Sequence, residues 1–328
     1  MAHIVINNYC NLRCPYCFAE GITAEPPESM ELSEVGRVLD FLSRSRPFRE
    51  QVGIVGGEPT LHPRFREVLA LVGRFARANG SPTLLLTNGV ELARHVEVLP
   101  TGMAVLVNVN SPDDTGDEAF LKTLSSVSAL AKRGSGEFTL GCNLYPGRSD
   151  YGYIWDVLSH YGCQNVRMSV VSPFGCGACE RGDKESYFEK MKPVFVRFCE
   201  DAIRHGVAVK RDCSQIPPCY FSPEELEVLG AATTSGELGP IYCSSMADFR
   251  VGGLVSTCYG WGAKPVPYEK FRDVAEVYAY FDRRVQPQVV ERNIGNERCA
   301  SCEHAALGRC CGGCPAFAPP AKQKGSAQ

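Results

Sequence analysis

The apolar positions of residues 3–206 follow two alternating periods. Short runs of β-branched and aliphatic residues predict six buried strands, at 3–8, 51–57, 83–89, 103–111, 138–146 and 166–173. Apolar residues at helical spacing predict helices at 29–46, 63–80, 118–134, 151–162 and 184–206. Strands that alternate with helices form parallel sheets with right-handed crossovers. The pattern therefore predicts an α/β fold, and six such units favour a partial (β/α)6 barrel of the TIM type over the alternative, a short doubly wound sheet.

Polar residues stand where the predicted strands end. A cysteine-bearing stretch follows the first strand, and the segment "GGEPTLHP" (56–63) follows the second. Thr87, Asn108 and Asn143 lie at the ends of the third, fourth and fifth strands. Functional residues of such barrels gather at the carboxyl ends of the strands. These features therefore predict one site at that rim.

Composition limits the function classes. The 328 residues carry a net charge of −3, which gives no reason to expect a nucleic-acid or acidic-membrane partner. The sequence has neither an apolar stretch long enough to span a membrane nor a signal-peptide pattern, so we expect a cytoplasmic protein. Its 17 cysteines, an odd number without a secretory signal, favour metal or redox chemistry over a disulfide scaffold.

The first cysteines have a spacing suited to an iron–sulfur cluster. Cys10, Cys14 and Cys17 form the pattern C-x3-C-x2-C, and neither a cysteine nor a histidine follows until His62. A structural zinc site requires four ligands. Three thiolates around a 4Fe-4S cluster instead leave one iron open to an external ligand.

The stretch "CNLRCPYC" resembles the cluster motif of the radical S-adenosylmethionine enzymes. In that motif the residue before the third cysteine is aromatic, as Tyr16 is here, and it would lie beside the adenine. The residues Gly56, Gly57, Glu58 and Pro59 resemble the second motif of the family, which binds the methionine amino group. Glycines let the backbone approach the ligand closely, and Glu58 offers an acceptor for an ammonium group.

The resemblance implies the cofactors and the reaction. S-adenosylmethionine would chelate the open iron, and an electron from a flavodoxin- or ferredoxin-type donor would cleave it to methionine and a 5'-deoxyadenosyl radical. That radical removes hydrogen from an unactivated C–H bond. Thr87, Asn108 and Asn143 are candidates to hold the ribose and carboxylate, with Arg167 as a further carboxylate partner. The alternative is that these polar groups satisfy loop backbone.

The second half of the chain resembles the SPASM or twitch extension, which carries auxiliary 4Fe-4S clusters. Cys243 and Cys258 give C-x9-G-x4-C, and "CASCEHAALGRCCGGC" gives C-x2-C-x7-C-x3-C. The resemblance divides the chain into a radical domain at 1–208 and an iron–sulfur domain at 209–328. A zinc ribbon is the alternative, because paired hooks also bind zinc.

The resemblance implies one or two auxiliary clusters. The first would use Cys243, Cys258, Cys314 and either Cys213 or Cys219. The second would use three cysteines and a fourth ligand that remains open between Cys311, the unused member of the pair 213 and 219, and an open iron. Adjacent cysteines ligate one cluster only with awkward geometry, which favours Cys213 or an open iron. The three cysteines of the second cluster that the resemblance implies are Cys299, Cys302 and Cys310.

Three further residues are candidates for the catalytic step. Relatives that mature sulfatases have an aspartate where this chain has Tyr259, which argues against sulfatase-type alcohol oxidation. Tyr259 is either a substitute for that base or packing against a cluster. Cys176 and Cys179 follow the sixth strand and are either a hydrogen donor or redox pair at the barrel mouth, or incidental loop thiols. We expect Cys142, Cys163 and Cys199 to lie in the core.

Three function classes follow. Enzymes with this extension mostly crosslink or epimerise ribosomally made peptides, and a maturase of this kind is the first expectation. Against that expectation, the barrel starts at residue 3, without the leader-recognition domain that many such enzymes carry before it, so a separate leader-binding protein would favour the peptide interpretation. A small-molecule dehydrogenase or epimerase acting on a sugar or aminocyclitol is the alternative. A non-catalytic metal scaffold is a third class, but a scaffold has no need of an open iron.

Overall fold

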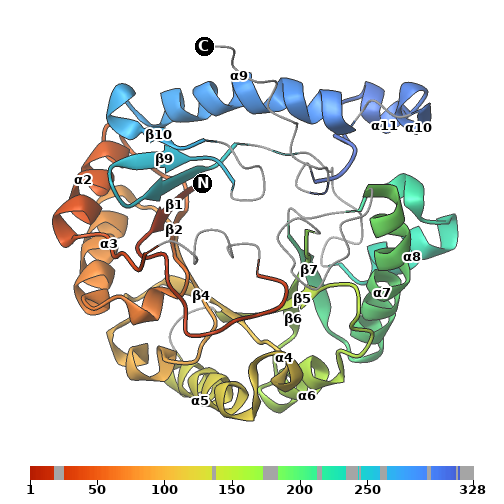
Figure 1. Cartoon of the computed structure of the whole chain (residues 1–328). Helices are drawn as coiled ribbons and strands as arrows, with labels where there is room; N and C mark the ends of the chain where they lie inside the picture. Colours follow the sequence, from red (N-terminus) through yellow and green to blue (C-terminus); the bar gives the residue numbers. More distant parts are fainter. Residues whose placement is uncertain are drawn as a thin grey trace.

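The structure is a computed structural model that describes residues 1–17, 26–134, 138–172, 184–212, 216–233, 243, 245–258, 264–293, 297–314 and 317. Its strands form one sheet in the order β10-β9-β8-β1-β2-β3-β4-β5-β6-β7, with a ring of helices outside it (Figure 1). Neighbours from β8 through β1 to β7 are parallel, whereas β8, β9 and β10 are antiparallel to one another. The strands are β1 (Ala2–Val5), β2 (Val52–Val55), β3 (Thr83–Thr87), β4 (Met103–Asn108), β5 (Phe138–Leu144), β6 (Asn165–Val170), β7 (Ala208–Arg211), β8 (Ala247–Arg250), β9 (Leu254–Ser256) and β10 (Val266–Pro267).

Helices connect the parallel strands and cover the outside of the sheet. The long ones are α2 (Leu32–Leu42), α3 (Phe65–Asn79), α5 (Asp117–Arg133), α6 (Gly152–His160), α7 (Lys184–Arg204), α8 (Pro223–Ala231) and α9 (Val274–Asn293). Short helices are α4 (Pro112–Thr115), α10 (Glu297–Ala300) and α11 (Glu303–Ala306), with 3-10 turns η1 (Pro59–Leu61), η2 (Leu92–Arg94), η3 (Val96–Val98), η4 (Pro218–Tyr220) and η6 (Tyr268–Lys270). Among the described residues, no helix has the length and hydropathy needed to span a membrane.

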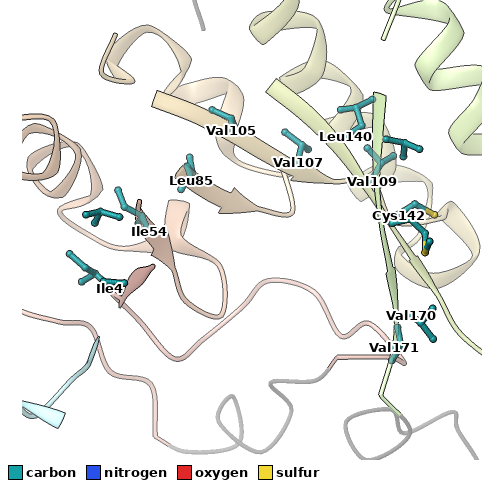
Figure 2. Close-up of a cluster of buried hydrophobic side chains, with 14 of the residues drawn as sticks. Ile4, Ile54, Leu85, Val105, Val107, Val109, Leu140, Cys142, Val170 and Val171 are labelled. Carbon is teal, nitrogen blue, oxygen red and sulfur yellow. The ribbon is translucent and has the colours of Figure 1, made fainter. Parts of the chain in front are cut away.

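The outer face of the sheet carries the core. Ile4, Ile54, Leu85 and Val105 are successive register partners across β1 to β4, and all are buried (Figure 2). Their row continues to Phe249 of β8, whose ring contacts Phe41 of α2 at a centroid distance of 5.7 Å. Because successive residues of a strand point to opposite faces, the alternate positions face the inside of the barrel.

The inner face carries a row of polar residues on β4, β5 and β6. Asn108 of β4 is paired with Gly141 of β5, which is paired with Arg167 of β6, so these positions form one inward-facing row. Asn143 stands two residues further along β5 and points the same way. On the same face but farther along the sheet, Nδ1 of His3 in β1 forms a hydrogen bond of 2.9 Å with Asp248 in β8. Polar groups on the inside of a half-open barrel are available to bind a ligand there.

The partial-barrel prediction is confirmed, and the sheet extends beyond it. The six predicted strands and the helix at 184–206 correspond to β1 to β6 and α7. The structure adds β7 beside β6, and it places β8, β9 and β10 of the cysteine-rich half next to β1. The domain boundary between residues 208 and 209 stays a prediction, and the sheet contains strands from both sides of it.

Candidate cofactor site

The cysteine loop, residues 9–17, leaves the end of β1 and brings three thiols together. Burial, followed by the negative charges of Cys10 and Cys17, raises the pKa of Cys14 to about 12. The pKa of Cys10 is likewise raised by burial and then by the charges of Glu58 and Cys17. Each thiol therefore lies in the electric field of the others. Bound to a cationic metal centre, thiols in such a setting ionise outright.

Two donors of the protein point at the Cys10 sulfur. The backbone N–H of Leu12 lies 3.4 Å from Cys10 Sγ, and the Asn88 Nδ2 lies 3.6 Å from it. Asn88 Nδ2 also donates to Asn11 Oδ1 over 2.8 Å. Hydrogen bonds to ligand sulfurs are one of the means by which a protein sets the potential of an iron–sulfur cluster. The loop after β3 thus supports the cysteine loop through Asn88.

The two glycines after β2 let the chain pass close to the cysteine loop. A Cβ on Gly57 would lie 2.3 Å from the carbonyl oxygen of Tyr9, and one on Gly56 would lie 2.0 Å from Asn7 Oδ1. The N–H of Gly57 donates to Asn7 O over 3.0 Å, and the N–H of Glu58 donates to Tyr9 O over 2.8 Å. No other residue type fits this approach without a shift of the backbone.

The carboxylate of Glu58 is buried and accepts four hydrogen bonds from the protein. Oε1 accepts from the hydroxyl of Thr60 at 2.6 Å, from the N–H of Thr60 at 3.1 Å and from the hydroxyl of Thr87 at 2.6 Å. Oε2 accepts from the N–H of Asn88 at 2.7 Å. Burial raises the pKa of Glu58, and these hydrogen bonds oppose the rise. Glu58 therefore connects the loops after β2 and β3 rather than presenting a free carboxylate.

Tyr16 lies at the other end of the cysteine loop, in a second polar network. Its hydroxyl donates to Asn110 Oδ1 over 2.6 Å, and its ring lies 4.7 Å from that of Tyr145. The Tyr145 hydroxyl donates to Asp114 Oδ1 over 2.6 Å, and Arg148 pairs with Asp114 at 3.4 Å. Burial strongly raises the pKa of Tyr16, so its hydroxyl stays protonated and acts as a donor. The network attaches the loop to β4 and β5.

The inward-facing row contains the remaining polar candidates. Arg167 donates to Asn143 Oδ1 over 3.2 Å and is ion-paired with Asp212, which follows β7. Asn108 Oδ1 is buried and has no hydrogen-bond partner among the described residues. Thr87 differs from these, because its register with Val107 places it on the helix-covered face and its hydroxyl donates to Glu58. The sequence predicted four ligand-holding polar groups, and three of them face the barrel interior.

The residues present fit a cluster with S-adenosylmethionine. Asn7 Oδ1, beside Gly56, is a second buried acceptor without a partner among the described residues. A ligand that brings an amino group and ribose hydroxyls supplies the donors that Asn7 and Asn108 lack. Within the described parts of the chain, no three His, Cys, Asp or Glu side chains surround a single metal ion. A four-iron cluster does not require that arrangement, because each cysteine binds a different iron.

Some predicted site residues lie outside the described residues, and the sequence did not predict some of the residues that surround the site. Cys176, Cys179, Cys213 and Tyr259 are not described. Cys142 and Cys199 are buried, as expected, and Cys163 is partly buried against the core. Asn7 lies three residues before Cys10, and Asn88 directly follows Thr87, so their position beside the predicted site residues was the available signal. Tyr145 and Asp114 gave no such signal, because only the fold brings them to Tyr16.

A family model and several curated relatives each match part of the chain. Residues 4–157 match the model described as the radical SAM superfamily. A putative glycyl-radical enzyme activating enzyme of Methanocaldococcus jannaschii is 33% identical over 90 residues, 27% of this chain and 32% of the relative. A GTP 3',8-cyclase of Pectobacterium atrosepticum is 33% identical over 141 residues, 38% of this chain and 40% of the relative. The alignments span well under half the length of these relatives.

A solved structure matches the fold over nearly the whole chain. SuiB of Streptococcus suis, bound to S-adenosylmethionine, superposes with a TM-score of 0.65 at 13% identity, covering 96% of this chain and 72% of SuiB. SuiB bound to its precursor peptide SuiA gives a TM-score of 0.63 at 15% identity, covering 96% of this chain and 71% of SuiB. At these identities the likeness concerns the fold alone. Together with the cysteine loop and the GGEP turn, the family match identifies residues 4–157 as a radical SAM domain.

Proposed function

We propose that this chain is a peptide-modifying radical SAM enzyme of the SPASM or twitch type, which crosslinks or epimerises a ribosomally made peptide. The observation that carries the proposal is the likeness to SuiB, which extends over 96% of the chain and so includes the cysteine-rich half. SuiB has been solved with a precursor peptide bound. The proposal adds auxiliary 4Fe-4S clusters in that half.

A 4Fe-4S cluster and S-adenosylmethionine, when bound, supply the 5'-deoxyadenosyl radical that removes a hydrogen atom from the substrate. Cys10, Cys14 and Cys17 would hold the cluster. Asn88 donates toward the Cys10 sulfur, and Glu58 fixes Asn88. Tyr16, held by Asn110, would border the adenine. These residues hold the loop in one conformation, so that the ligand need not order it on binding.

The inner face of the barrel would position the substrate. Asn108, Asn143 and Arg167 face inward from three adjacent strands, and Asp212 limits the positions open to the Arg167 guanidinium. Asn108 Oδ1 accepts a hydrogen bond from either the ribose or a peptide N–H. A barrel wall of this kind excludes water from the reacting carbon and directs the radical to one C–H bond.

The experiment has two parts. Anaerobically reconstituted, reduced protein is mixed with S-adenosylmethionine and assayed for 5'-deoxyadenosine, with a variant carrying Cys10, Cys14 and Cys17 all changed to alanine as the control. We expect product only with the unchanged cysteines. Equal product from both proteins would exclude radical chemistry at this site.

The second part tests the substrate class. Short open reading frames beside the gene are expressed with the enzyme, and the peptides are examined by mass spectrometry. A loss of two hydrogens indicates a crosslink, and uptake of one deuterium from D2O at unchanged composition indicates epimerisation. The GTP 3',8-cyclase relatives favour a small-molecule substrate as the second candidate. Unmodified peptides, together with turnover of a sugar or a nucleotide, would establish that alternative.

A further inference from the structure

The cysteines of the second half form two groups, and the first contains Cys219. The guanidinium of Arg298 lies 5.1 Å from the ring centre of Tyr220, which brings their chain neighbours Cys299 and Cys219 together. The N–H of Cys302 donates to Cys299 O over 3.2 Å, closing the C-x2-C turn. The pKa of Cys219 is raised by burial and then by the charges of Cys299 and Cys310, with a smaller effect of Cys302.

The second group contains Cys311. Burial raises the pKa of Cys311, a hydrogen bond from the backbone of Cys243 to its thiol opposes the rise, and the charge of the adjacent Cys310 adds to it. Burial raises the pKa of Cys243 to about 12, with further contributions from the charges of Cys258 and Cys311. Cys311 and Cys314 are separated by two glycines and so form another C-x2-C turn. Cys258, Cys311 and Cys314 all pack against the core.

The boundary between the groups falls between two adjacent residues. Cys310 Sγ accepts from the N–H of Gly312 at 3.3 Å, whereas the Cys311 thiol donates to Gly313 O at 3.3 Å. Gly312 and Gly313 have φ of 78° and 95°, which only glycine adopts readily, and a Cβ on Gly313 would lie 3.2 Å from both Pro217 and Phe188, which is a tight contact. The bend lets consecutive thiols belong to different groups.

Lys184 of α7 lies near thiols of both groups. Its Nζ donates to Gly312 O over 3.2 Å. Burial lowers the pKa of Lys184, and the charges of Cys299, Glu185, Cys311 and Cys219 oppose that decrease. One ammonium is thus within the field of thiols from both groups.

We propose that Cys219, Cys299, Cys302 and Cys310 ligate one auxiliary cluster, and that Cys243, Cys258, Cys311 and Cys314 ligate the other. The proposal rests on the proposed function in so far as the clusters are iron–sulfur centres. Each set has four thiols and one C-x2-C turn, so neither cluster needs an open iron or Cys213. The adjacent residues Cys310 and Cys311 then bind different clusters, so two neighbouring thiols need not bind the same cluster.

The experiment isolates the auxiliary clusters from the radical site. The full chain with Cys10, Cys14 and Cys17 changed to alanine is reconstituted anaerobically, and iron, sulfide and zinc are counted. We expect about eight irons and eight sulfides per chain. In this background Cys219→Ala and Cys311→Ala are each expected to remove about four irons, or to convert one cluster into a three-iron form seen by EPR and Mössbauer spectroscopy. Cys213→Ala is expected to leave both clusters intact.

Several outcomes would overturn the assignment. Loss of a cluster in Cys213→Ala with retention in Cys219→Ala would exclude Cys219 as the ligand. Two zinc ions without sulfide would replace the iron–sulfur centres by zinc sites. Cys219→Ser and Cys311→Ser preserve the size of the side chain, so circular dichroism of these variants separates loss of a ligand from loss of the fold. Because the background makes no radical, a failure of the proposed function leaves the iron counts unaffected.

Discussion

The backbone N–H of Asn88 donates to Glu58 Oε2 over 2.7 Å, and this bond joins the loops that follow β2 and β3. The Asn88 side chain then reaches Asn11 Oδ1 at 2.8 Å and Cys10 Sγ at 3.6 Å. Three rim loops, distant in sequence, are therefore held by one carboxylate and one amide. The geometry of the cysteine loop therefore depends on Glu58, although Glu58 itself does not point at the thiols of that loop.

Glu58→Gln should weaken both the fold and the loop. Glutamine has only one amide oxygen, so its NH2 group would replace one carboxylate oxygen and face a group that now donates a hydrogen bond to that oxygen. We expect a loss of about 1–3 kcal/mol in the free energy of unfolding, because buried donors lose their acceptor. Urea unfolding of the metal-free protein measures it. Thr60→Val, which removes only one of these donors, should cost less, and equal losses would contradict a shared role for both oxygens.

Gly57→Ala should be far more damaging than an ordinary glycine substitution. Its Cβ would meet the carbonyl carbon of Tyr9 at 2.4 Å, so the cysteine loop must move. Gly36, inside α2, has open space around it, and Gly36→Ala should raise stability by about 0.5–1 kcal/mol. Iron content after reconstitution and thermal unfolding compare the pair. A Gly57→Ala protein with full iron content would show that the close approach is dispensable.

The sequence predicted the barrel because its strands and helices have strong local periods, and α3 ends at Gly80 as expected. It did not predict that β8 pairs with β1, since residues 248 and 3 become neighbours only through the whole fold. At the site, motif spacing identified Cys10, Cys14, Cys17 and the GGEP turn. That Glu58 offers an acceptor to a ligand stays a prediction, and the structure adds that its carboxylate accepts hydrogen bonds from Thr87 and Asn88.

Asn88→Asp should lower the reduction potential of the radical-site cluster. Aspartate keeps the Oδ1 acceptor that binds the Val90 N–H, but it lacks the Nδ2 donor to Cys10 Sγ and adds a negative charge. Both changes disfavour the reduced, more negative cluster, by on the order of tens of millivolts. EPR-monitored redox titration measures the shift. An unchanged potential would mean that Asn88 does not contact the loaded cluster.

Cys142 and Cys199 should resist alkylation in the folded protein. Each is 1% exposed, and burial raises the pKa of each thiol to about 12. Almost no thiolate is present at pH 8, and reagent cannot reach the sulfur. In metal-free protein treated with iodoacetamide, peptide mapping should find these two unmodified and Cys10 modified. Rapid labelling of Cys142 or Cys199 without denaturant would contradict their place in the core.

The same two thiols give stability a dependence on alkaline pH. Their pKa is raised from 9.0 in the unfolded chain to about 12 in the folded one, so the unfolded state releases protons first. Their contribution is complete below pH 9.0 and is lost as the pH rises toward about 12, at up to about 1.4 kcal/mol per pH unit for each thiol. A Cys142→Ala/Cys199→Ala variant should show a shallower decline in urea unfolding between these pH values. Parallel curves would contradict the linkage.

Lys184→Gln should lower the potentials of both auxiliary clusters, which follows from the ligand sets proposed above. Lys184 lies in the field of Cys219 and Cys299 of one group and of Cys311 of the other. Removing its positive charge disfavours the added electron at each centre by on the order of tens of millivolts at moderate ionic strength. Lys122→Gln on α5, an exposed lysine paired with Glu118, is the matched control and should change neither potential. A shift at only one cluster would place Lys184 beside that cluster alone, and would require the other set of four thiols to lie farther from α7.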